Sequence, residues 1–306
     1  MLRVIILGSG AGGGVPQWNC GCRVCRAART DPPALQRTQT SIAVSADDRH
    51  WFLINASPDL RAQVNATPRL HPARGELRHS PIAGVILTNG EIDAIAGLLT
   101  LREGSPFAIY AHADVLATLD ANSIFNVLDR SRVPRVAIEP EVAFSPRLPD
   151  GTQAQIEIVP FAVPGKPAWY LGDTARDTRP GDTLGLEIKD RHSRRALIVV
   201  AACAAVTPEL KARLDGAALV LFDGTLWRDD ELIASHLGQK TGQQMGHIAM
   251  SGDHGAIAAL AGLAIGRKMF LHINNSNPVL LPNSEERRVA EDAGWEIPDD
   301  GMELTL

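Results

Sequence analysis

The chain has 306 residues, of which 45% are hydrophobic and 21% are charged, a composition ordinary for a globular protein with a large buried core. Its net charge of −5 and aromatic content of only 5% argue against a nucleic-acid partner, which favours a positive surface and stacking rings. The sequence holds neither a run of about 20 apolar residues nor an apolar leader with a cleavage site, so we expect no membrane partner and a cytoplasmic location.

The amino-terminal stretch predicts a strand over 3–7, followed by a glycine-rich loop. Gly8-Ser-Gly-Ala-Gly-Gly13 matches the dinucleotide-binding pattern G-x-G-x-x-G. That pattern needs a helix directly after it, whereas Pro16 and a group of cysteines follow here. We therefore reject a nucleotide site, and expect the glycines to let the backbone approach another element closely.

Three cysteines form the densest chemical signal in the chain. Cys20, Cys22 and Cys25 follow the pattern Cys-x-Cys-x-x-Cys, and thiols at this spacing converge as a structural tetrahedral Zn²⁺ requires. An iron–sulfur cluster would need a fourth cysteine, and Cys203 lies in an apolar run typical of a buried, inert thiol. The fourth zinc ligand is therefore an asparagine, a histidine, a water or a residue from elsewhere, and we expect a zinc-binding arm over about 8–29.

The remaining elements follow in two similar halves. Strands are expected over 37–44, 51–55, 85–87, 107–111, 155–159, 185–188, 196–200, 218–222 and 268–272, and helices over 59–64, 92–101, 113–119, 208–214 and 284–293. Each half places paired strands first and alternates strands with helices afterwards. This order favours one α/β domain over 1–306, with two sheets packed face to face and helices outside.

Polar residues gather where the strand over 85–87 gives way to a helix. Asn89, Glu91 and Asp93 lie at this junction. Taken alone, they are explained by helix capping, because the free N–H groups and dipole of a helix amino end favour such side chains. As part of a larger site, they would supply ligands from a strand end.

Other polar residues come just after predicted strands in the second half. Asp223, His272 and Asn275 are of this kind, and strand ends at one edge of a sandwich can bring them together with Asp93. Each by itself is more often a turn or cap residue. His247 and His236 are weaker candidates, since either can be an ordinary surface or capping histidine. Together with the central loop, these residues predict a shared site.

The stretch 85–97 resembles the metal-binding loop of the metallo-β-lactamase superfamily, which carries His-x-His-x-Asp-His between a strand and a helix. Here the same positions are Asn89-x-Glu91-x-Asp93-Ala94, so only the aspartate is kept. The superfamily's middle histidine falls near Gly165 and its bridging aspartate near Ala202, and both are missing. Hydrolysis by two metal ions requires a full ligand set, so the resemblance favours another chemistry.

More specific blocks resemble the PqqB family of pyrroloquinoline quinone (PQQ) biosynthesis proteins. They cover 8–25, 55–59, 78–81, 97–104, 222–225, 240–247 and 272–278. The resemblance implies an α/β fold, a metallo-β-lactamase-like αβ/βα four-layer sandwich of two mixed β-sheets with outer helices. It also implies that Cys20, Cys22 and Cys25 hold the structural Zn²⁺, with Asn275 at the fourth ligand position of a related phosphodiesterase.

For function, the resemblance implies oxidative hydroxylation of the tyrosine-derived ring of the peptide-derived, cross-linked Glu-Tyr precursor of PQQ. Asp93 and His272 would hold an active-site Fe²⁺ or another divalent metal, with Glu91 or Asp223 completing the set. Because the family usually has a histidine where Ala94 stands, we expect this metal to be weakly bound or absent.

Two alternatives stay open, a carrier that delivers PQQ or its precursor to the periplasm and a degenerate metallo-hydrolase. Other PQQ-biosynthesis proteins and a second copy of the chain near the zinc site are the expected macromolecular partners.

Overall fold

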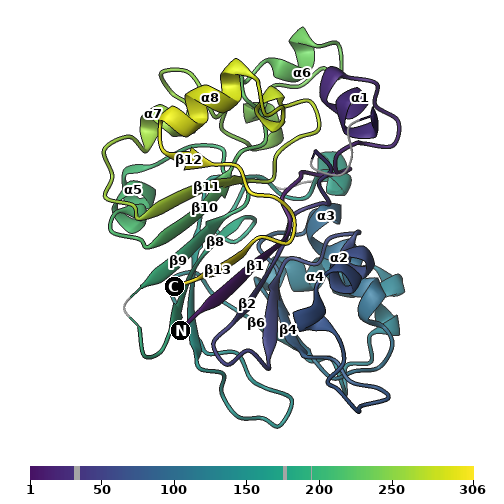
Figure 1. Cartoon of the computed structure of the whole chain (residues 1–306). Coiled ribbons are helices and arrows are strands. Elements are labelled where there is room, and N and C mark those ends of the chain that lie inside the picture. The colour runs from purple at the N-terminus through teal and green to yellow at the C-terminus, as the bar shows by residue number, and fades with distance from the viewer. Residues whose placement is uncertain (31–34, 175–177, 194) are drawn as a thin grey trace.

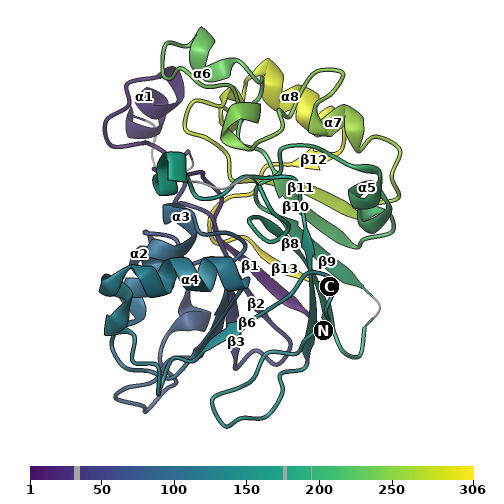
Figure 2. The same cartoon turned by 180° about the vertical axis from the view of Figure 1, so that it is seen from behind.

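The computed structural model describes residues 1–30, 35–174, 178–193 and 195–306. Two mixed β-sheets pack face to face and helices cover both outer faces, which confirms the predicted four-layer sandwich (Figure 1 and, from behind, Figure 2). The first and last strands pair, so the two termini lie close together. None of the helices in these ranges is long and apolar enough to cross a membrane.

The first sheet combines an antiparallel and a parallel half. Its strand order is β13 (Glu303–Thr305), β1 (Arg3–Gly8), β2 (Ser41–Ser45), β3 (Trp51–Ile54), β4 (Ile82–Ile86), β5 (Ala108–Ala111) and β6 (Arg135–Ala137). Strands β13 to β3 pair antiparallel and β3 to β6 pair parallel.

The second sheet has a related arrangement. Its order is β12 (Trp295–Glu296), β11 (Arg267–Leu271), β10 (Leu219–Asp223), β9 (Ala196–Val200), β8 (Leu184–Asp190) and β7 (Ile156–Ala162). Strands β12 to β9 are parallel and β9 to β7 are antiparallel. The parallel strands bring several carboxyl ends to one edge of the sandwich, where polar loop residues can meet.

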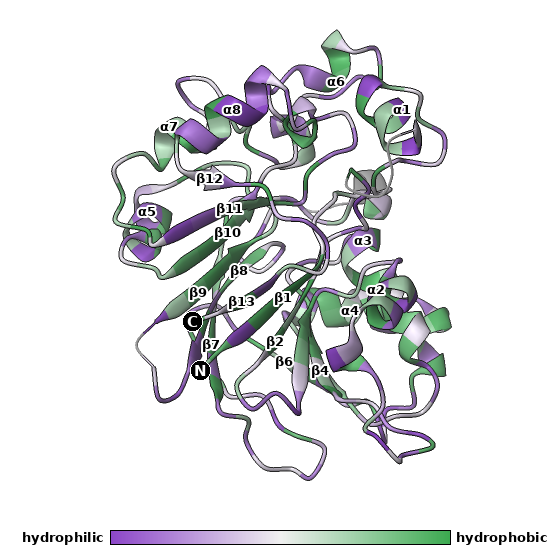
Figure 3. Cartoon of the chain, viewed as in Figure 1, coloured by the Kyte–Doolittle hydropathy of each residue, from purple (hydrophilic) through white to green (hydrophobic). Residues whose placement is uncertain are grey.

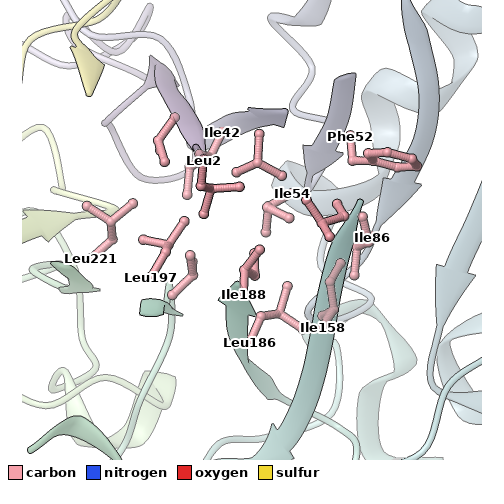
Figure 4. Close-up of a cluster of buried hydrophobic side chains, with 14 of the residues drawn as sticks. Leu2, Ile42, Phe52, Ile54, Ile86, Ile158, Leu186, Ile188, Leu197 and Leu221 are labelled. Atoms are coloured by element: carbon pink, nitrogen blue, oxygen red, sulfur yellow. The ribbon is translucent and has the colours of Figure 1, made fainter. Parts of the chain in front are cut away.

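The core lies between the two sheets. Ile42 and Ile54 of the first sheet belong to the same buried cluster as Leu197 and Leu221 of the second (Figure 4). Because side chains alternate along a strand, the neighbours of these residues point outwards to the helices. Both faces of the central strands are therefore covered, and Figure 3 shows the resulting hydrophobic colouring of β9 and β10.

Helices of two groups complete the layers. Buried residues of α2 (Leu60–Ala66), α3 (Ile92–Ile95) and α4 (Ala113–Ala121) pack on the first sheet. Those of α1 (Arg23–Thr30), α5 (Pro208–Leu214), α7 (Ala256–Ala259) and α8 (Glu285–Asp292) pack in the cluster on the second, while α6 (Glu231–Ala234) lies near α1 in Figure 1.

Several predicted boundaries are wrong for identifiable reasons. The helix expected over 92–101 ends as α3 at Ile95 and continues as the 3-10 helix Ala96–Leu101. A Cβ at Gly97 would lie 2.0 Å from the carbonyl oxygen of Ser57, so this segment presses its backbone against a neighbouring turn. The strand expected from 37 starts at Ser41, and Arg37 and Gln39 form only isolated bridges to the glycine-rich loop. Short elements such as α1 and β6 were not predicted.

Candidate metal sites

The cysteine site gathers all three predicted thiols. The sulfur atoms of Cys20, Cys22 and Cys25 lie within 4.8 Å of one another. Cys22 Sγ is 3.3 Å from the backbone oxygen of Asn275, and Asn275 Nδ2 is 3.3 Å from Cys25 Sγ. Asn275 thus lies beside the thiols, to which it presents its backbone oxygen and its side-chain nitrogen, and its place as the fourth ligand stays a prediction. Three thiolates and one oxygen fit a tetrahedral Zn²⁺.

The thiols of this group differ in their pKa. Burial raises the pKa of the Cys22 thiol to about 11, whereas hydrogen bonds with Cys22 and Cys25 outweigh burial and hold the pKa of the Cys20 thiol below its usual value. A bound cation would ionise the coordinating thiols outright. Cys203 lies elsewhere, is fully buried as predicted, and has its pKa raised to about 12, chiefly by burial.

A second group lies at the carboxyl ends of β4, β10 and β11. Asp93 stands in the first turn of α3 and His272 follows β11 directly, and Asp93 Oδ2 is 2.9 Å from His272 Nε2. His272 has a φ of 56°, a left-handed conformation that is uncommon for a residue with a side chain. The sharp turn is held by Ile273, whose N–H donates to the oxygen of Ser9. The sequence prediction that joined Asp93 with His272 agrees with this geometry.

The two residues of this pair shift each other's protonation. Burial acts to lower the pKa of His272, but the hydrogen bond and charge of Asp93 outweigh it and the pKa is raised above 6.5. Burial acts to raise the pKa of Asp93, but the hydrogen bond with His272 outweighs it and the pKa is lowered below 3.8. Both groups are thus favoured in their charged forms.

Asp223 is bonded to several neighbours. It is fully buried, its Oδ1 accepts from the N–H and hydroxyl of Thr225, and its Oδ2 accepts from the N–H of Cys203 and from His247 Nδ1 at 2.7 Å. A carboxylate has about four lone-pair positions, and these bonds use all of them. Asp223 thus positions Thr225 and His247, and with His247 and His272 it forms a group whose ligand atoms lie within 4.8 Å of one another, so its place in a metal ligand set stays a prediction.

His247, a weaker candidate for the site from the sequence, lies beside His272 in the structure. Its ring stacks on that of His272 with 5.1 Å between centroids and an angle of 17°. The motif Met245-Gly-His247, which the family resemblance already included, was the available signal. His236, the other weaker candidate from the sequence, is exposed and does not line the cavity described below.

Glu91 lines the same cavity as Asp93 and His272, but its carboxylate already has partners. Its Oε1 lies 2.5 Å from Lys166 Nζ and accepts from the N–H of Trp169 at 3.2 Å. Tyr170 donates its hydroxyl to the oxygen of Gly90 at 2.7 Å. Glu91 thus anchors the segment around 166–170 to the central loop, and its expected role as a metal ligand stays a prediction.

Asp93, His247 and His272 open into a cavity of about 870 Å³. Its wall includes Gly12, where a Cβ would lie 3.3 Å from Asp93 Oδ2, so the glycine-rich loop makes the close approach that the sequence suggested. Lys240 and Gln244 contribute polar groups on another side. The size suits a small-molecule ligand.

Three positions stand where the resemblance to the metallo-β-lactamase superfamily would place ligands. Ala94 is 3% exposed, belongs to the buried cluster on the first sheet and is not among the cavity-lining residues. At Gly165 a Cβ would lie 2.1 Å from Thr183 Oγ1, so that position leaves no space for a histidine. Ala202 lines the cavity without offering a donor atom.

Comparisons with known proteins agree with the fold. Residues 50–273 match the beta-lactamase superfamily domain. Coenzyme PQQ synthesis protein B of Rhodopseudomonas palustris strain BisB5 is 67% identical over the full length of both chains, and that of Bradyrhizobium diazoefficiens is 63% identical over the same extent. The chain belongs to the coenzyme PQQ synthesis protein B family.

Solved structures support this membership of the PQQ synthesis protein B family. The crystal structure of Zn²⁺-bound PqqB from Methylobacterium extorquens has a TM-score of 0.93 and 46% identity, covering 99% of this chain and 100% of that one. A diphosphatase from the PhnP family has a TM-score of 0.67 at 19% identity, covering 100% of this chain and 98% of that one. This second similarity shows the shared fold alone.

Proposed function

We propose that this protein acts in PQQ biosynthesis as a metal-dependent enzyme that hydroxylates the tyrosine-derived ring of the cross-linked Glu-Tyr precursor. The observation that carries the proposal is the Asp93–His272 pair, with 2.9 Å between Oδ2 and Nε2, opening into a cavity of about 870 Å³. The names of the full-length relatives support the pathway.

The donor set fits a divalent metal that is bound weakly and keeps open positions. One carboxylate and one imidazole suit Fe²⁺ in its oxygen chemistry better than a closed structural zinc site does. Ala94 adds no third ligand, and a bond from Asp223 to the metal would have to replace one of the hydrogen bonds that it makes now. Iron bound to Asp93 and His272 would supply the activation of dioxygen. The Zn²⁺ of the Methylobacterium relative supports zinc in this protein too, for which the three cysteines offer the better donor set.

The protein's own residues would bind and orient the precursor. His272 Nδ1 lies 2.9 Å from Thr225 Oγ1, a contact that fixes the ring and directs Nε2 towards Asp93. Lys240 lines the cavity and is exposed, so its ammonium group can attract the carboxylates of a glutamate-derived molecule. The aromatic ring would then lie deeper, near the Asp93–His272 pair.

A carrier function is the second candidate, and Ala94 favours it. A protein that only binds and delivers PQQ or its precursor needs the cavity but no third metal ligand. The same carboxylate and ring contacts would serve this role, and other PQQ-biosynthesis proteins would be the partners. A hydrolase depends on the two-metal ligand set and has the least support.

Oxygen consumption separates these functions. The protein, with zinc at the cysteine site, is loaded anaerobically with Fe²⁺ and mixed with the precursor and oxygen, with His272→Gln as the control. Oxygen uptake matched by a hydroxylated product in the wild type alone is the expected result. Precursor binding without oxygen uptake would assign the carrier function, and the absence of both would overturn each proposal.

A further inference from the structure

Thr225 lies at the centre of a small hydrogen-bond network. Its Oγ1 is 2.7 Å from Asp223 Oδ1, 2.9 Å from His272 Nδ1 and 3.0 Å from His247 Nδ1. The hydroxyl has one hydrogen, and a carboxylate oxygen can only accept, so that hydrogen goes to Asp223. His272 Nδ1 then donates to Thr225 Oγ1, and His247 Nδ1 donates to Asp223 Oδ2, 2.7 Å away, with Thr225 as a second and longer contact. The network therefore fixes a hydrogen on Nδ1 of each ring.

The other nitrogen of each ring is left for different partners. Nε2 of His272 faces the carboxylate of Asp93. Nε2 of His247 has no hydrogen-bond partner among the residues that the structure describes, although its side chain is only 14% exposed and lines the cavity. In the neutral form of the ring, with its one hydrogen on Nδ1, this Nε2 has a lone pair and is a hydrogen-bond acceptor.

Asp223, His247 and His272 form a group whose ligand atoms lie within 4.8 Å of one another. The rings of His247 and His272 are stacked and nearly parallel, with 5.1 Å between centroids. Because the lone pair of a ring nitrogen lies in the plane of its ring, the two Nε2 atoms of such stacked rings do not point at each other. Nε2 of His247 can therefore take its own partner in the cavity while Nε2 of His272 keeps its contact with Asp93.

We infer that His247 is a substrate-binding residue whose Nε2 accepts a hydrogen bond from the phenolic hydroxyl of the ligand, and that Asp223 is the residue that positions it. The inference rests on the proposed function for the identity of the ligand as a phenol. The hydroxyl keeps its hydrogen, and the bond holds the ring beside the Asp93–His272 pair.

Two small probes isolate the hydroxyl. The compounds 3-(4-hydroxyphenyl)propionate and 3-phenylpropionate differ only in this group, and calorimetry measures their affinities for the full chain with zinc at the cysteine site and no added iron. A hydrogen bond of ordinary net strength should make the phenol bind about 3–10-fold more tightly to the wild type. His247→Asn keeps a donor for Asp223 but removes the nitrogen that faces the cavity, so the two affinities should become equal.

Two further variants make the test decisive. His247→Gln places an amide near the Nε2 position and should keep part of the preference, while His236→Asn, outside the cavity, should keep all of it. Equal affinities in the wild type, or an undiminished preference in His247→Asn, would overturn the inference. A phenol preference in a protein that consumes no oxygen with the precursor would leave the inference standing and refute the hydroxylase.

Discussion

The cysteine site and the active-site cavity begin from the same loop after β11, yet they differ in completeness. Asn275 reaches the cysteines and His272, three residues earlier, reaches the cavity. The cysteine site offers three thiols beside the backbone oxygen of Asn275, whereas the proposed metal site in the cavity offers one carboxylate and one imidazole. One loop thus contributes to two groups with different numbers of donors, and the same loop joins the two sheets through the hydrogen bond from Ile273 to Ser9.

The largest effect is expected at the cysteine site. Cys22→Ser removes one of three thiolates, so the zinc content should fall from one equivalent towards zero. Binding of structural zinc is worth about 10–16 kcal/mol in small zinc-dependent folds, and here its loss should unfold the arm over about 8–29. Metal analysis, thermal melting and limited proteolysis of the arm measure the outcome.

Cys203→Ala is the matched control for this change. It also removes a cysteine, but that thiol is buried on the second sheet, away from the three zinc-binding candidates, so zinc should stay bound. Full zinc content and an unchanged melting temperature in Cys22→Ser would refute the zinc assignment. Sedimentation of the same variant tests whether a homodimer depends on the arm.

Restoring a ligand in the cavity should give the next largest effect. Loss of a partner that only orients a ligand weakens metal binding by about 10–100-fold, so Ala94→His should tighten Fe²⁺ or Mn²⁺ binding by at least that factor. Calorimetry with the cysteine site already loaded measures it.

Ala94→Leu adds similar volume without a donor and controls for packing. Because Ala94 is 3% exposed, either larger side chain must displace neighbours, at a typical cost of about 1–3 kcal/mol. Equal metal affinities in the wild type and Ala94→His, with equal loss of stability in both variants, would mean that the new imidazole stays within the apolar cluster to which Ala94 belongs.

The Asp93–His272 pair predicts a smaller, pH-dependent effect. The raised pKa of His272 stabilises the fold fully below pH 6.5, and this contribution is lost as the pH rises through the folded-state value. The lowered pKa of Asp93 stabilises the fold above pH 3.8 and is lost as the pH falls through its folded-state value. Their joint contribution is greatest between these limits.

Asp93→Asn removes the carboxylate and should lower the pKa of His272, as followed by NMR of its ring protons. The difference in melting temperature between wild type and variant should be larger near pH 5 than near pH 8. A His272 titration that the substitution does not move would show that the two side chains do not interact in solution.

The features that the sequence predicted by spacing alone come from residues close together in the chain. Cys20, Cys22 and Cys25 lie within six residues, so their spacing was enough to predict a shared site. The cavity combines residues from three separate strand ends, and resemblance supplied Asp93 and His272. The hydrogen bonds of Asp223 and the stacking of His247 on His272 depend on the registers of β10 and β11 and on a long loop. The spacing of apolar residues in the sequence does not encode these registers. Gly97 ended a helix for a tertiary reason, the contact with Ser57.

The smallest effect is expected for substitution of Glu91, which tests whether this carboxylate holds the segment over 166–170 in place or binds the metal ion. Its ion pair with Lys166 joins side chains that are 21% and 31% exposed, and such pairs contribute about 0.2–1 kcal/mol. Glu91→Gln keeps an oxygen for the N–H of Trp169 and removes only the charge. Metal affinity should therefore stay within about two-fold of the wild type, while amide hydrogen exchange over 166–171 becomes faster, because a weaker anchor lets this segment open more often.

Lys166→Gln breaks the pair from the other side and should accelerate exchange equally. If Glu91→Gln weakened metal binding as much as Asp93→Asn does, Glu91 would be a ligand and the ion pair with Lys166 only its resting contact.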